Sequence, residues 1–252
     1  MTERAAVTLN PSELLADQTH NLEKFFGQEA LPEPPKKLLE FVERTSEKGF
    51  TFEPYLEPGR QFPQDAEYPG WRVKPQPWFY DQIRQDNISP DAAKLPLQWA
   101  AMETIVRPNY DGGMQLYQND ALAPILEDLR KRGRIAVPDW CKHVPSISRF
   151  GISPKEISAP VATRVADEIG KVDAQNVDAT TYMAFNYLGN IAHSEFGEAN
   201  TWEWFADKFG DDRRLIGGNS DNGGLANVHY NSSDNRNGYV GFRLRVVFPS
   251  NP

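Results

Sequence analysis

The segment between Gly217 and Tyr239 constrains this chain more than any other part of its sequence. It contains six asparagines together with several Asp and Gly residues, types that are depleted in β-strands. The apolar run GFRLRVVF follows directly at 241–248 and is typical of a strand in a core. A polar segment tied to such a strand predicts an exposed surface on a fixed apolar frame, which is the arrangement that a binding face needs.

The composition indicates a folded chain with a sizeable core. Hydrophobic residues make up 39% and aromatic residues 12% of the 252 positions, which argues against disorder of the whole chain. The net charge of −8 argues against nucleic acid as the main partner, because phosphate binding depends on clustered Lys and Arg.

The single cysteine, Cys141, allows neither an intramolecular disulfide nor a zinc site built from cysteines. The N-terminal residues lack the apolar stretch of a secretory signal peptide, and no run of about 18 apolar residues predicts a membrane span. We therefore expect a protein that is cytoplasmic or exposed on the surface of a virus particle.

Capping signals and apolar periodicity predict a helical first part of the chain. The strongest signal is the capping box from Ser153 to Glu156, with Pro154 at the first helical position. The proline-rich stretch 50–77 predicts an extended arm packed by its aromatic residues, and the short apolar runs after Glu198 predict small strands. The predicted helices span residues 10–27, 36–48, 78–85, 120–132, 153–169 and 180–191, with one further turn at 89–91.

Two groups of residues could carry chemistry. Cys141 lies two positions from His143, and such a pair could supply a nucleophile and its base, although a packed thiol is the commoner outcome. His193, Glu195 and Glu198 could approach a metal, but the His-Glu-x-x-His motif is absent and we favour a solvated turn.

Three motifs follow one another near the C-terminus: NTWEWFAD at 200–207, RLIGG at 214–218 and VGFRL at 240–244. In this order they resemble the C-terminal half of C-type lectin folds of the formylglycine-generating-enzyme type. The resemblance implies an α+β protein, with a helical, Pro-rich N-terminal extension at 1–60 and a C-type lectin-like domain at 61–252. The matching residues are Asn200, Trp202, Glu203, Trp204, Arg214, Gly217, Gly218, Ser220, Gly241, Phe242 and Arg243.

Within this fold, the chain resembles the variable proteins of diversity-generating retroelements, which are known from phages, bacteria and archaea with their viruses. In that family an error-prone reverse transcriptase rewrites adenines in a C-terminal segment, so that AAC-type codons yield Asn, Asp, Ser, Tyr, His, Gly or Ala and never a stop. The resemblance implies a variable region at about 213–245. The ligand-contacting positions that it implies are Asn219, Asp221, Asn222, Asn227, His229, Asn231, Asp234, Asn235, Asn237 and Tyr239. The positions that would stay fixed are Gly217, Gly218, Gly223, Gly224, Leu225, Arg236, Gly241, Phe242 and Arg243.

The function that the resemblance implies is binding of a protein or glycan ligand through the C-terminal face, without a reaction; the oligomeric state is left open. The alternative is a formylglycine-generating-type oxidoreductase on the same fold. That chemistry uses a pair of cysteines to hold copper, and this chain has only Cys141, so we disfavour the enzyme. We expect no catalytic cofactor, while relatives of the fold often carry a structural calcium ion near the segment that matches Trp202, Glu203 and Trp204.

Overall fold

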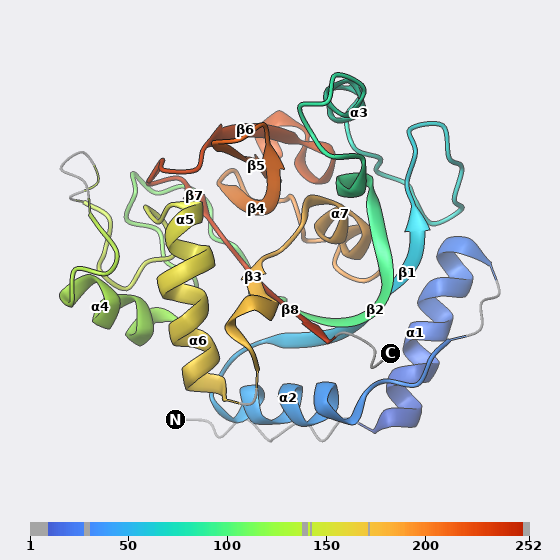
Figure 1. Ribbon diagram of the computed structural model, residues 1–252, viewed down its shortest axis with the longest axis horizontal. Coiled ribbons are helices and arrows are strands. Elements are labelled where there is room, and N and C mark those ends of the chain that lie inside the picture. The colour runs from blue at the N-terminus through green and yellow to red at the C-terminus, as the bar shows by residue number, and fades with distance from the viewer. Residues whose placement is uncertain (1–9, 28–30, 138–140, 142, 171, 249–252) are drawn as a thin grey trace.

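The computed structural model describes residues 10–27, 31–137, 141, 143–170 and 172–248. They form two four-stranded sheets with helices between and around them, which confirms the predicted α+β class (Figure 1). The first sheet has the order β1-β2-β8-β3, and each neighbouring pair is antiparallel. Its strands are β1 (Phe52–Gln61), β2 (Lys94–Glu103), β3 (Val177–Ala179) and β8 (Leu244–Phe248).

The C-terminal strand β8 fills an inner position of this first sheet. Its residue Val246 lies opposite Val177 of β3, and Phe248 lies opposite Trp99 of β2. Leu244, Val246 and Phe248 are buried and alternate with half-buried residues, as the period of a strand requires. The predicted apolar run at 241–248 is therefore part of the core.

The second sheet has the order β6-β5-β4-β7. Strands β5 and β6 continue antiparallel from β4, whereas the short β7 runs parallel to β4, with Trp202 opposite Val240. This parallel pairing places the first and the third sequence motif side by side. The strands are β4 (Trp202–Phe209), β5 (Arg213–Gly217), β6 (Val228–Ser232) and β7 (Val240–Gly241).

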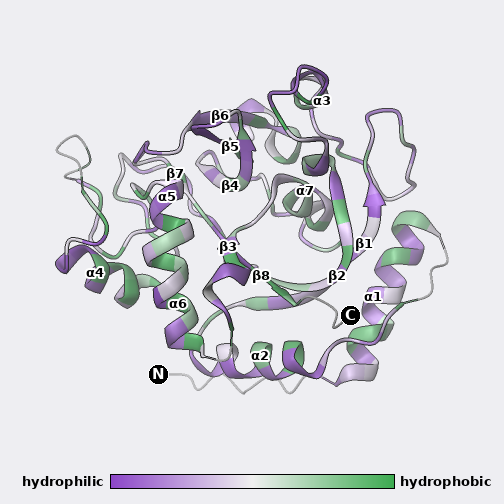
Figure 2. Ribbon diagram, viewed as in Figure 1, coloured by the Kyte–Doolittle hydropathy of each residue, from purple (hydrophilic) through white to green (hydrophobic). Residues whose placement is uncertain are grey.

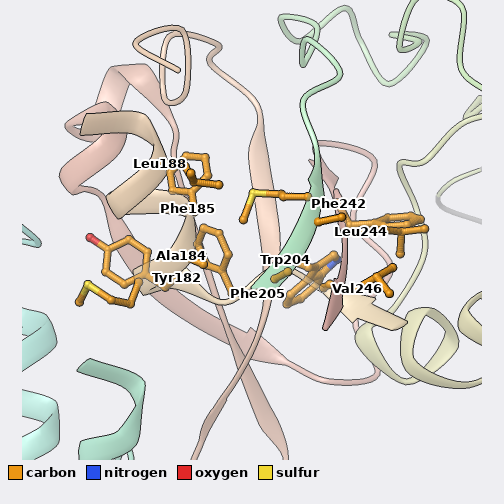
Figure 3. Close-up of a cluster of buried hydrophobic side chains, with 14 of the residues drawn as sticks. Tyr182, Ala184, Phe185, Leu188, Trp204, Phe205, Phe242, Leu244 and Val246 are labelled. Carbon is orange, nitrogen blue, oxygen red and sulfur yellow. The ribbon is translucent and has the colours of Figure 1, made fainter. Parts of the chain in front are cut away.

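Helix α7 (Tyr182–Ile191) lies between the two sheets (Figure 1). All its residues except Asn190 are buried, which is expected of a helix that is apolar on every side. Figure 3 shows Phe185 of this helix in one cluster with Phe205 of β4 and Leu244 of β8. The helix predicted at 180–191 is thereby confirmed, and it lies in the core.

The N-terminal helices α1 (Pro11–Phe26) and α2 (Lys36–Glu47) agree with prediction and cover the first sheet. Asn10 caps α1 by accepting a hydrogen bond from the Ser12 amide at 3.0 Å. The remaining predicted helices are α3 (Pro77–Arg84), η1 (Pro90–Ala93) and α4 (Ala123–Lys131).

The helix predicted at 153–169 is present but changes its winding. The capping box forms between Ser153 and Glu156, and the helix then runs through α5 (Pro154–Glu156), the π-helical turn η3 (Ile157–Val161) and α6 (Ala162–Ile169). Pro160 lies inside η3 and cannot donate to the preceding turn, so local widening of the helix accommodates its ring.

Strand β1 differs from the prediction, which had residues 50–77 as an extended arm, and β2 lies where no element was predicted. Pro54 and Pro58 lie within β1 and pair with Ala101 and Leu97 of β2. Because β1 is the edge strand of its sheet, its prolines do not have to donate to a further strand. The predicted boundary between the N-terminal extension and the C-terminal domain, at residues 60 and 61, falls at the end of β1. Buried side chains from before and after this boundary belong to one hydrophobic cluster.

We predict that Leu56→Ala, in β1, destabilises the whole protein by about 2–5 kcal/mol. Leu56 is fully buried and lies opposite Trp99. Leu97→Ala is the matched control: Leu97 is 59% exposed on the partner strand, and its loss should cost about 0.5 kcal/mol or less. Urea unfolding followed by tryptophan fluorescence measures both changes; an unchanged midpoint for Leu56→Ala would contradict the single core.

Candidate functional site

The predicted variable region rests on a buried ion pair between Glu203 of β4 and Arg243, which directly precedes β8. Arg243 Nε donates to both carboxylate oxygens of Glu203 at 3.0 Å, and its Nη2 donates to Oε1 at 2.7 Å. Both residues are buried, with exposures of 0% and 2%. The pair joins the motif TWEW to the motif GFR, which are 40 positions apart in the chain.

Both members of this pair are held in their charged forms. Burial alone would raise the pKa of Glu203, but Arg243 and Arg107 outweigh it, so the pKa of this carboxyl lies below its usual value of 4.5. Burial would likewise lower the pKa of Arg243, and the Glu203 charge raises it instead. The pair is therefore ionised at neutral pH.

A second buried pair extends the network towards the first sheet. Arg149 Nη1 and Nη2 donate to Glu103 at 2.6 and 2.9 Å, and its Nε donates to Asp120 at 2.8 Å. The Glu103 carboxylate also accepts from the Leu244 amide at 2.9 Å, while its backbone carbonyl accepts from Arg243 at 3.0 Å. The start of β8 is thus fixed by both ion pairs.

Arg107 connects this network to the loop that begins the predicted variable region. Its Nη1 lies 3.8 Å from Glu203, and its Nη2 donates to the carbonyls of Gly218 and Ala199. Gly218 has a φ of +77°, and a Cβ there would lie 2.9 Å from the ring of Phe185. Glycine is required at 218 by conformation and by space.

Two of the predicted contact positions, Asn219 and Asn227, point inward. Asn219 is 3% and Asn227 5% exposed. The Asn227 side-chain oxygen accepts from the Asn219 amide at 3.3 Å, and the Asn219 side chain donates to the Asn200 carbonyl. Such amides replace backbone hydrogen bonds in a tight loop, so these two residues hold the loop and do not face a ligand. We correct their assignment from the contact set to the frame.

The other predicted positions reach the surface. Asp221, Asn222, His229, Asp234 and Tyr239 are exposed, and Asn231, Asn235 and Asn237 are half-buried. They come from the turn η5 (Ser220–Asn222), the edge strand β6 and the connection from β6 to β7. Figure 2 shows β6 mostly in hydrophilic colours.

These exposed positions do not converge on one pocket. The Asn235 amide donates to the Asn231 side chain at 2.8 Å, and Asn222 donates to Asn219 at 2.7 Å. Tyr239, in contrast, precedes β7 at the opposite edge of the sheet from His229. Three strand spacings separate these edges, a distance of about 14 Å. The arrangement fits a broad contact surface better than a closed site.

Sequence reasoning missed an aromatic contribution from α3 to this surface. The rings of Trp78 and His229 stack at 5.3 Å with an interplanar angle of 7°. Tyr230 stacks on Phe209 at 4.0 Å, and the Arg213 guanidinium lies 4.8 Å from the Tyr230 ring centroid. Trp78 precedes His229 by about 150 positions in the chain, so no local pattern signals that the two meet.

The Cys141 thiol is packed. It is buried and donates to the Arg236 carbonyl at 2.9 Å, and burial raises its pKa. A raised pKa disfavours the thiolate that a nucleophile needs. His143 instead lies against Gly113 and Gly238.

His193 forms ion pairs on both sides of its ring. Its Nδ1 lies 3.0 Å from Glu195, and its Nε2 lies 3.2 Å from Glu53 of β1. Burial opposes the charged imidazole, but the two carboxylates outweigh it and raise the pKa of His193. Glu198, the third residue of the possible metal group, does not take part in either of these ion pairs. Across the described ranges, no three His, Cys, Asp or Glu side chains form a group that could hold a metal.

Glu203 does not fit a calcium site in this arrangement. Calcium takes several oxygen ligands and competes poorly for a carboxylate that already neutralises a guanidinium. Both oxygens of Glu203 accept hydrogen bonds from Arg243, and Arg107 adds a further positive charge at 3.8 Å.

Within the described part of the chain, no helix is long and apolar enough to cross a bilayer. Comparison with known proteins found no matching family model, curated protein or solved structure.

We predict that Glu203→Gln destabilises the protein by about 3–5 kcal/mol, because it leaves Arg243 buried without its counter-charge. Arg243→Met should cost a similar amount, and the double variant less than the sum of both. Glu127→Gln, which breaks an exposed pair with Lys131, is the control and should cost about 1 kcal/mol or less.

The dependence of the free energy of unfolding on pH in the acidic range gives an independent check of this pair. The pKa of Glu203 is lowered on folding. Its contribution to the free energy of unfolding is therefore complete above pH 4.5 and is lost as the pH falls through the lower folded value. Unfolding free energies from denaturant titrations over this range should therefore fall more steeply for the unaltered protein than for Glu203→Gln; equal slopes would contradict the assignment.

We predict the opposite pH dependence for His193. The pKa of His193 is raised on folding. The stability that the charged imidazole contributes is therefore complete below pH 6.5 and is lost as the pH rises through the higher folded pKa. The stability difference between the unaltered protein and His193→Gln should shrink with increasing pH. His20→Gln, at an exposed position of α1, serves as the control in the same denaturant titrations.

Proposed function

We propose that this chain is a binding protein: the variable protein of a diversity-generating retroelement, on a C-type lectin-like fold of the formylglycine-generating-enzyme type. One observation carries the proposal. In the Asn-rich segment most side chains reach the surface, while the backbone beneath them is held by buried glycines, buried amides and the Glu203–Arg243 pair.

This division is what a diversified surface requires. Substitution of exposed side chains usually changes stability by about 0.5 kcal/mol or less, whereas loss of buried side chains costs several kcal/mol. A segment with polar, exchangeable side chains outside and fixed anchors inside can therefore vary its ligand contacts and keep its fold. Asn, Ser and Tyr also supply adaptable hydrogen bonds, as they do in antibody loops.

The buried network supports the finer fold assignment, because it gives each matching motif a structural role. Glu203 of the first motif pairs with Arg243 of the third, and the carbonyl of Gly218 in the second accepts from Arg107. Motifs that meet around one ion pair are a more specific likeness than motifs that match only in order.

The proposed contact set consists of eight residues and excludes Asn219 and Asn227. It includes residues from both edges of the second sheet, so the proposed ligand is a protein or a glycan that covers a broad surface. The proposed location is the cytoplasm or the surface of a virus particle. The eight residues are Asp221, Asn222, His229, Asn231, Asp234, Asn235, Asn237 and Tyr239.

The decisive experiment is to sequence the DNA next to the gene. We expect a reverse transcriptase gene and a near-copy of the codons for residues 213–245, in which adenines stand wherever the two copies differ. Those adenines should fall in codons of the eight proposed residues and spare Gly218 and Arg243. A near-copy that differs at other bases, or no near-copy, would refute the assignment.

We further predict that the two groups of positions respond differently to substitution. Asp221→Ala and Tyr239→Ser should change the free energy of unfolding by about 0.5 kcal/mol or less. Asn219→Ala and Asn227→Ala should each cost about 1–3 kcal/mol, because each leaves buried hydrogen-bonding groups without a partner. Thermal or urea unfolding of the four variants tests this, and equal costs in both groups would count against a fixed frame.

A further inference from the structure

Exposed apolar side chains gather in the loop 106–116, next to the proposed contact surface. Val106 is 69%, Tyr110 49%, Met114 53% and Leu116 37% exposed. We call these four residues the apolar ridge; Tyr239 of the proposed contact set, which is 40% exposed, is not counted in it. Among the described residues, the other exposed large hydrophobic side chains are Val73, Leu97 and Val137, which are scattered. Four exposed large apolar side chains within the one loop 106–116 mark a candidate interaction site.

The apolar ridge is held against the predicted variable region by hydrogen bonds. The Gln115 side chain accepts from the amides of Asp111 and Gly113 at 3.1 Å and donates to the Gly238 carbonyl at 2.5 Å. The Tyr110 amide donates to Asn200 at 2.7 Å. The loop is therefore ordered before any partner arrives, which lowers the entropic cost of binding.

Three of the segments around the apolar ridge carry exposed negative charge without Lys or Arg, and Arg236, just outside them, is half-buried and paired with Glu156. Residues 108–129, 193–203 and 217–235 contain neither Lys nor Arg, whereas Asp111, Glu198 and Asp221 are exposed. These segments are neighbours, because Asn200 bonds Tyr110 and the Ser220 amide donates to the Ala199 carbonyl at 3.0 Å. An apolar centre with an acidic border complements an apolar centre with a basic border.

We propose that the apolar ridge is a constant docking surface for a protein partner that presents apolar side chains bordered by Lys or Arg. Aliphatic side chains such as Val106 and Met114 bury apolar protein surface, which a glycan does not offer. Interface cores are apolar and carry most of the affinity, while polar surroundings tune specificity. This inference rests on the proposed function for the different roles of the two surfaces: the apolar ridge anchors the partner, and the diversified residues select it.

The first test uses a phage library of random 12-residue peptides, panned against the immobilised full chain. We expect the selected peptides to combine apolar residues with Lys or Arg, and their binding to weaken with added salt. The Kd of a selected synthetic peptide should rise at least tenfold for Met114→Ser and for Tyr110→Ser. Leu97→Ser, which removes an exposed apolar side chain elsewhere, should leave it unchanged. Peptides without this composition, or binding that survives both ridge variants, overturn the proposal.

The second test asks whether the partner is another copy of this chain. Sedimentation velocity of the unaltered protein and of Met114→Asp should give the same species for both. A dimer that Met114→Asp dissociates would overturn the proposal of a different protein partner. The ridge tests do not depend on the neighbouring DNA, so absence of a near-copy there refutes the proposed function and leaves the ridge result standing.

Discussion

Two carboxylate–guanidinium pairs, Glu203 with Arg243 and Glu103 with Arg149, are enclosed where the two sheets of this protein meet. Each charge costs several kcal/mol to remove from water, and the attraction within the pair offsets this cost only when its geometry is satisfied. Arg243 finds its partners only when β2, β4 and the start of β8 are all in place. The pairs therefore contribute less to net stability than to the choice of one arrangement of strands.

That arrangement explains how a segment of polar residues keeps a defined shape. Asn219 and Asn227 supply the hydrogen bonds that a regular strand would supply, and Arg107 ties the Gly218 carbonyl to the buried charges. The eight side chains of the proposed contact set have no comparable role in holding the loop. The proposed binding role follows from these exposed side chains. The apolar ridge beside them adds apolar surface that a partner can bury.

Helices were predictable here because their signals are local: Asn10 with Pro11, and Ser153 with Glu156, lie within one turn of each other. Strands β1 and β2 could not be predicted in this way. The prolines of β1 argue against a strand unless it lies at the edge of a sheet, and that edge position is known only from the assembled sheet. For the candidate site, the exposed positions could be anticipated from residue type. Type alone could not separate Asn219 from Asn222, because asparagine serves equally well as a surface amide and as a loop brace. The contact between Trp78 and His229 has no local signal.

The inner position of β8 has a consequence for biosynthesis. Because β8 follows both β2 and β3 in the chain, these two strands lack the neighbour that joins them until residues 244–248 have been synthesised. Long-range pairing of this kind slows folding and exposes strand edges to aggregation in the meantime. Residues 213–243 lie between β4 and β8 in the chain, so a substitution there that disturbs the frame would also hinder closure of the first sheet.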